Sequence, residues 1–112
     1  MTEVKIIKIW LDDQRNAPEG WIHLHNIEEV ERLVELIRGG NDFLIDTMSF
    51  DFHLAHPKNG LDVMKYLADL CIKEKTKIFW PKNILYHSSD TKAVVMMKNF
   101  VESLETNLLC KC

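Results

Sequence analysis

The sequence has few cysteines, prolines and glycines, and it has no long apolar run. Its 112 residues include three cysteines, three prolines and four glycines, and no apolar run is long enough to span a membrane. The cysteine number is odd and the spacing fits no disulfide framework, which indicates reduced thiols. Because the net charge is -3 and the basic residues are scattered, a surface that neutralises duplex DNA is not expected.

What remains is the composition of an ordinary folded protein. Hydrophobic residues make up 46% of the chain, which suits one packed core, and the length predicts a single domain over residues 1–112. Met1-Thr2-Glu3 is not followed by the apolar core of a signal peptide. We therefore expect a soluble, cytoplasmic protein.

The cysteines suggest little chemistry. Cys71 lies within an apolar helical pattern and is interpreted as a small core residue. Cys110 and Cys112 form a C-x-C pair, which is either a weak candidate for a soft metal or part of a frayed terminus.

Hydrophobic periodicity predicts strands that alternate with helices. The strands are expected at 5–11, 21–25, 43–50 and 83–86, with a stub at 108–110. The helices are expected from a cap at Asn26 to Gly39, from Gly60 past Cys71, and from Ser89 or Asp90 through Leu104. Asp46 interrupts the third strand and indicates a bulge or an exposed face. The alternation predicts an open, parallel α/β sheet.

Polar residues directly follow three of these strands. Asp12-Asp13 follows the first, Asp51 the third, and His87-Ser88 the fourth. Ligands of such sheets bind beyond the carboxyl ends of the strands. Two carboxylates ~4 Å apart repel by about 4 kcal/mol at an effective dielectric of ~20, so the acids require a cation or a shared proton. Taken alone, the pair Asp12-Asp13 is equally well explained as a turn former, and the same reading is the less favoured alternative for Asp51.

Other polar residues near these strand ends have open roles. His53 is a general acid, a metal ligand or a solvated loop residue. His87 and Ser88 precede a helix N-terminus and could receive phosphate oxygens. Arg15 either binds phosphate in a bidentate manner or pairs with a surface acid.

The combined pattern resembles a divergent branch of the response-regulator receiver domains. This branch, the cyclic-phosphate processing receiver-like domains, is common in bacteria and their phages. The matching stretches are Leu11-Asp12-Asp13, Arg15, Pro18, Gly20-Trp21, Ser49-Phe50-Asp51-Phe52-His53-Leu54, Asn59-Gly60-Leu61 and His87-Ser88. They extend over most of the chain, from about residue 5 to 100.

The resemblance implies a flavodoxin-like, receiver-type fold with strand order 2-1-3-4 and a short fifth strand. It also implies a phosphoesterase that acts on a cyclic phosphate of a nucleotide or an RNA end. Mg²⁺ or Mn²⁺ would be held by Asp12, Asp13 and Asp51.

In this picture the remaining site residues act on the phosphate. His53 or His87 would protonate the leaving oxygen, and Arg15 and Ser88 would hold the phosphate. The protein would work in the cytoplasm, or in the host cytoplasm if it is phage-encoded.

Two departures from the family pattern support other functions. Phe52-His53 stands where the branch has His-Asp, and Lys111 is the one candidate for the receiver lysine. A receiver that has lost its chemistry would bind a protein partner, such as a host factor. Alternatively, Asp51 would be a true phosphoacceptor.

Overall fold

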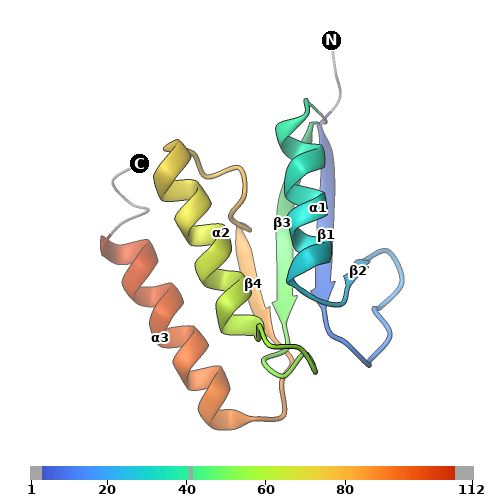
Figure 1. Cartoon of the computed structure of the whole chain (residues 1–112), viewed down its shortest axis with the longest axis vertical. Helices are drawn as coiled ribbons and strands as arrows, with labels where there is room; N and C mark the ends of the chain where they lie inside the picture. Colours follow the sequence, from blue (N-terminus) through green and yellow to red (C-terminus); the bar gives the residue numbers. More distant parts are fainter. Residues whose placement is uncertain (1–3, 41, 108–112) are drawn as a thin grey trace.

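The computed structural model describes residues 4–40 and 42–107, which form a parallel sheet and three helices (Figure 1). The strand order is β2-β1-β3-β4, and every pair of neighbours is parallel. In chain order the elements are β1 (Lys5–Leu11), β2 (Ile22–Leu24), α1 (Ile27–Arg38), β3 (Phe43–Phe50), α2 (Gly60–Glu74), β4 (Asn83–Tyr86) and α3 (Thr91–Asn107). The predicted receiver-like architecture and strand order are confirmed.

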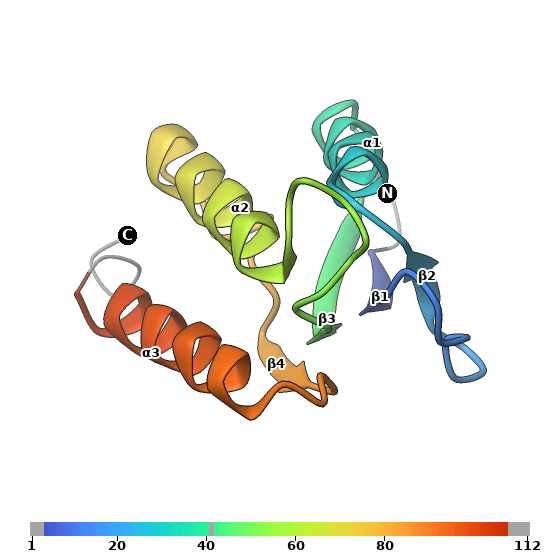
Figure 2. The same ribbon diagram turned by 60° about the horizontal axis from the view of Figure 1, so that its bottom comes forward.

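The two faces of the sheet differ in composition. In β1, Ile7, Ile9 and Leu11 are buried, whereas Ile6 on the other face is 67% exposed. α1 and α2 lie over the buried face, and α3 packs beside α2 near the β4 edge (Figure 2). The other face, which includes Ile6, Trp10, Ser49 and Leu85, carries none of the described helices, and we call it the open face.

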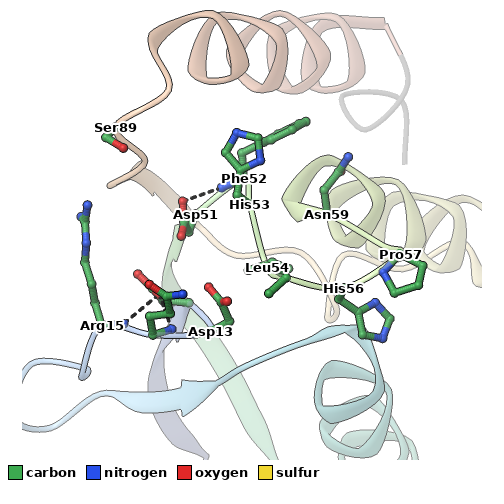
Figure 3. Close-up of a pocket in the computed structure, with 13 residues that line it drawn as sticks. Asp13, Arg15, Asp51, Phe52, His53, Leu54, His56, Pro57, Asn59 and Ser89 are labelled. Atoms are coloured by element: carbon green, nitrogen blue, oxygen red, sulfur yellow. Dashed lines mark hydrogen bonds between the residues drawn. The ribbon is translucent and has the colours of Figure 1, made fainter.

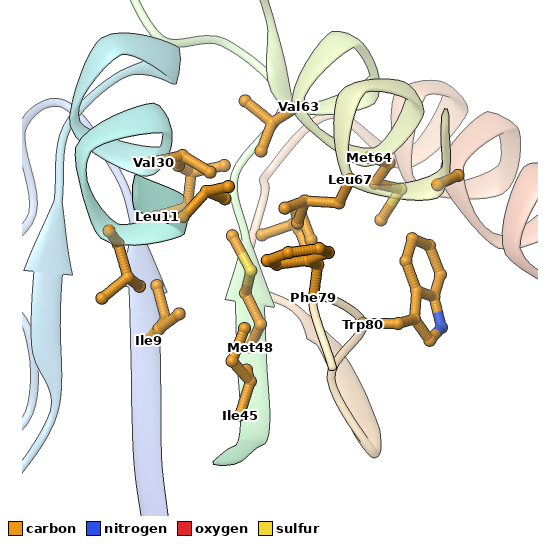
Figure 4. Close-up of a cluster of buried hydrophobic side chains, with 14 of the residues drawn as sticks. Ile9, Leu11, Val30, Ile45, Met48, Val63, Met64, Leu67, Phe79 and Trp80 are labelled. Carbon is orange, nitrogen blue, oxygen red and sulfur yellow. The ribbon is translucent and has the colours of Figure 1, made fainter. Parts of the chain in front are cut away.

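One core holds the sheet and the helices together. Phe50, Phe79 and Met48 are among its largest fully buried side chains. Side chains from β1, β3, α1 and α2 meet there, together with Phe79 and Trp80 from the segment before β4 (Figure 4). This packing holds each strand in register with its neighbours.

The helices begin at the side chains that the sequence indicates. The Asn26 side chain accepts a hydrogen bond from the Glu29 amide at the start of α1. Asn59 and Asp62 form a complete capping box at the start of α2. At the start of α3, the Asp90 carboxylate accepts from the Ala93 amide. Each cap satisfies amides that have no partner within the helix.

The differences from the predicted elements are local. β2 is shorter than residues 21–25, and α3 extends past Leu104 to Asn107. Asp46 lies at a bulge, because the pairing of β1 with β3 shifts between Ile7 and Lys8. The loop from Asp12 to Gly20 contains no helix, and the expected strand at 108–110 lies outside the described residues.

Gly60 sets the distance between the end of β3 and the start of α2. Its amide donates to the Phe52 carbonyl at 2.8 Å, and a Cβ added there would lie 2.1 Å from the Asp51 carbonyl oxygen. The backbone therefore approaches more closely than any side chain allows.

We expect Gly60→Ala to lower the free energy of unfolding by about 1–3 kcal/mol, because the new methyl group must push α2 away from Asp51. Urea unfolding measures the change. Gly39→Ala is the matched control, since its Cβ would lie 3.2 Å from the nearest atom and its φ is -76°. Equal stability of Gly60→Ala and the wild type would contradict the close approach.

Candidate metal and phosphate site

The strand register brings three polar residues to one edge of the sheet. Leu11 pairs with Phe50, and Phe50 pairs with Tyr86. The next residues, Asp12, Asp51 and His87, are therefore neighbours. Donor atoms of these three side chains all lie within 4.8 Å of one another. We call Asp12, Asp51 and His87 the edge cluster.

Asp12 is the most buried member of the edge cluster, with 1% of its surface exposed. Its Oδ1 accepts from the amides of Gln14 at 2.8 Å and Arg15 at 2.9 Å. Its Oδ2 lies 3.0 Å from Nε2 of His87. A buried carboxylate is stable only when it is hydrogen-bonded in this way.

His87 is held on several sides. Its ring stacks on Trp10 with a centroid distance of 3.7 Å and an interplanar angle of 9°. Nδ1 lies 2.7 Å from Oγ of Ser49, and the His87 carbonyl accepts from Nη1 of Arg15 at 2.9 Å. Ser49 belongs to the sequence motif but was not predicted to be a site residue.

The charge states of Asp12 and His87 follow from these contacts. Burial lowers the pKa of His87 below its ordinary value, and the nearby Asp12 carboxylate offsets this in part. Burial raises the pKa of Asp12, but the amides of Gln14 and Arg15, together with His87, leave it below its ordinary value. At neutral pH the imidazole is therefore neutral and the carboxylate is ionised.

A pocket of about 560 Å³ opens beside the edge cluster (Figure 3). Its lining includes the predicted residues Asp12, Asp13, Arg15, Asp51 and His53. The Asp51 carboxylate accepts from the Phe52 amide at 2.9 Å. Asp13 lies on the pocket wall, outside the edge cluster, and the third side chain of that cluster is His87.

The predicted phosphate and acid residues have different positions. Arg15 is exposed and lines the pocket. Ser89 also lines it, whereas the Ser88 hydroxyl accepts from the Asp90 amide at 3.2 Å. The His53 side chain is 67% exposed, and its Nε2 lies 2.8 Å from Oδ2 of Asp90.

The remaining observations concern residues outside the edge cluster. Lys111, Cys110 and Cys112 are not in the described part of the chain. His23, in β2, contacts the Asp12 carbonyl at 2.7 Å through Nε2. Among the described residues, no helix is long and apolar enough to cross a membrane.

Comparison with known families identifies the pattern. The family model of the cyclic-phosphate processing receiver domain matches residues 7–103. The chain belongs to this family. No curated protein and no solved structure gives a significant match. The edge cluster and the pocket lie within the matched range, so they belong to the family domain.

Because the pKa of His87 is lowered, we expect the metal-free receiver domain to lose stability as the pH falls from 7.5 to 5. An unfolded histidine takes up a proton near pH 6.5, whereas folded His87 stays neutral to lower pH. The unfolded state then binds more protons, so the free energy of unfolding falls by up to about 1.4 kcal/mol per pH unit.

Urea unfolding in EDTA at several pH values, for the wild type and His87→Gln, measures this contribution. The variant should show a shallower dependence on pH over this range. Asp12, whose pKa is also lowered, contributes separately: its stabilisation is complete above pH ~4 and is lost at lower pH. Parallel curves for the two proteins would contradict the assignment to His87.

Proposed function

We propose that this receiver domain binds a divalent cation at the edge cluster and processes the cyclic phosphate of a nucleotide or an RNA end. The observation that carries the proposal is the convergence of Asp12, Asp51 and His87 within 4.8 Å. The name of the matched family supplies the cyclic phosphate.

The donor atoms of the edge cluster fit a divalent cation. Two carboxylates and an imidazole offer oxygen and nitrogen ligands at one point, and a cation relieves the repulsion between Asp12 and Asp51. Mg²⁺ prefers oxygen ligands, so the nitrogen of His87 favours Mn²⁺. Bound there, such a cation would polarise the phosphoryl group and activate a water molecule.

The pocket walls offer groups for the rest of the reaction. Arg15 lines the pocket and is exposed. Its Nη1 donates to the His87 carbonyl, and the rest of the guanidinium would bind phosphate oxygens. Ser88 is the serine predicted to hold phosphate, but Ser89 is the one on the pocket wall. We therefore assign the hydroxyl contact to Ser89.

Two histidines were candidates for the acid that protonates the leaving oxygen. Nε2 of His87 faces Asp12 within the edge cluster, and a nitrogen bound to a cation cannot donate a proton. His53 lines the same pocket and is mostly exposed. We therefore assign the proton donor to His53, oriented by Asp90.

The size of the pocket suits such a substrate. About 560 Å³ lies within the range of roughly 300–1,000 Å³ that is typical of small-molecule sites. One end of the pocket presents Asp51, and the other includes Leu54, His56 and Pro57 (Figure 3). Asp12 also lines the pocket and lies beside Asp51. The charged end suits the phosphate and the cation, and the other end suits the sugar or base.

A protein-binding function is the second candidate, and one observation favours it. The open face exposes apolar residues, including Ile6 at 67% and Leu85 at 50%, and exposed apolar patches often mark interaction sites. This function requires neither a response to metal nor turnover. The two experiments that follow therefore separate the candidates.

We expect Mn²⁺ to stabilise the wild type against thermal unfolding and Asp51→Asn to abolish this stabilisation. At a hundredfold excess over Kd, binding adds about 2.7 kcal/mol. Without metal, Asp51→Asn should be more stable than the wild type, because one of two crowded charges is removed. Thermal melts with and without MnCl₂, and with MgCl₂ for comparison, measure both effects.

Asp46→Asn is the matched control for this experiment. Asp46 lies on β3, the strand that Asp51 directly follows, and is also partly buried, but its carboxylate accepts from the Thr47 hydroxyl and is not part of the edge cluster. It should keep the full Mn²⁺ response. If neither ion stabilises the wild type against thermal unfolding, the proposal of a metal site is wrong.

We expect the wild type with Mn²⁺ to hydrolyse a 2′,3′- or a 3′,5′-cyclic nucleotide. Asp51→Asn should lose at least about a hundredfold in rate, because several kcal/mol of charge stabilisation disappear. His53→Ala should lose about 10²–10⁴-fold. His25→Ala, which removes an exposed histidine paired with Glu29 outside the pocket, should keep the wild-type rate. Full turnover by Asp51→Asn, or none by the wild type, would refute the enzymatic function.

A further inference from the structure

The imidazole of His87 makes a hydrogen bond at each nitrogen. Nε2 faces Oδ2 of Asp12 at 3.0 Å, and Nδ1 faces Oγ of Ser49 at 2.7 Å. Stacking on Trp10 fixes the plane of the ring. Ser49 fixes the rotation within that plane, so it determines which nitrogen points toward the edge cluster.

The proton positions follow from the partners. An ionised carboxylate can only accept a hydrogen bond, so Nε2 of the neutral ring carries the proton and donates it to Asp12. Nδ1 is then unprotonated and accepts from the Ser49 hydroxyl. In this tautomer the nitrogen that faces the edge cluster has no lone pair to offer a cation.

We propose that Ser49 is a positioning residue that lets His87 change from a donor toward Asp12 into a ligand of a divalent cation. This inference rests on the proposed metal site. When Nε2 becomes a ligand, its proton leaves to solvent and a proton from solvent binds Nδ1. The ring stays neutral, and Nδ1–H donates to Oγ of Ser49.

A serine hydroxyl suits this exchange because it donates in one state and accepts in the other after a single bond rotation. An outer partner that accepts from a ligand histidine also raises the basicity of the ligand nitrogen. Ser49 is 2% exposed, so its hydroxyl is shielded from substrate and does not act as a nucleophile.

The test is calorimetric titration of MnCl₂ into the metal-free wild type and three variants. Ser49→Ala should bind Mn²⁺ about 10–100-fold more weakly. Ser49→Thr, which keeps a rotating hydroxyl, should recover most of this loss. Thr47→Val is the matched control: Thr47 is a buried hydroxyl residue two positions earlier on β3, and it donates to Asp46 and not to His87. It should bind like the wild type.

Nitrogen NMR of the metal-free wild type is the second readout. It should show His87 with its proton on Nε2. A proton on Nδ1, or equal Mn²⁺ affinity for Ser49→Ala and the wild type, would overturn the role of Ser49. Absence of Mn²⁺ binding by the wild type itself would instead remove the proposed metal site, and the two failures are thus distinguishable.

Discussion

The hydrogen bond between the Asp12 carboxylate and the His87 imidazole ties the ends of β1 and β4 together across β3. It matters because Asp12 is nearly inaccessible to water, and a buried charge without partners would be strongly destabilising. Two backbone amides from the following turn complete the set. The turn then directs Arg15 back to the His87 carbonyl. Burial of one carboxylate thus organises the loop, the histidine and the arginine around a single point.

In the described part of the chain, helices cover only one face of the sheet. The chain after β1 forms a loop, and no described helix covers the open face. Trp10 and Ser49 are neighbours on that face, and there they contact the His87 ring. A helix packed on this face would bury the same residues in a core. Because no described helix packs there, the side chains that hold the His87 ring come from the sheet itself.

The candidate site combines residues at strand ends with residues on a loop. The edge cluster stands directly after paired strand residues, so its positions are set by the sheet. His53 follows on the loop between β3 and α2. The start of α2 is fixed by the close approach of Gly60 to Asp51. In the proposed function, a cation held at the strand ends and a proton donor on a loop would suit phosphate chemistry, in which positioning and charge stabilisation supply most of the rate.

The sequence alone determined the elements, the strand order and the edge where Asp12 and Asp51 meet. These features follow from local periodicity, from helix caps such as Asn59, and from family motifs that extend over most of the chain. The sequence did not reveal that His87 joins Asp12 and Asp51 in the edge cluster while Asp13 lies outside it. Nor did it reveal that Ser49 contacts His87, or that Ser89 and not Ser88 lines the pocket. Neighbouring residues point in different directions, so which atoms meet depends on the register between Leu11, Phe50 and Tyr86. That register is set by core packing between distant segments, which only the tertiary structure decides.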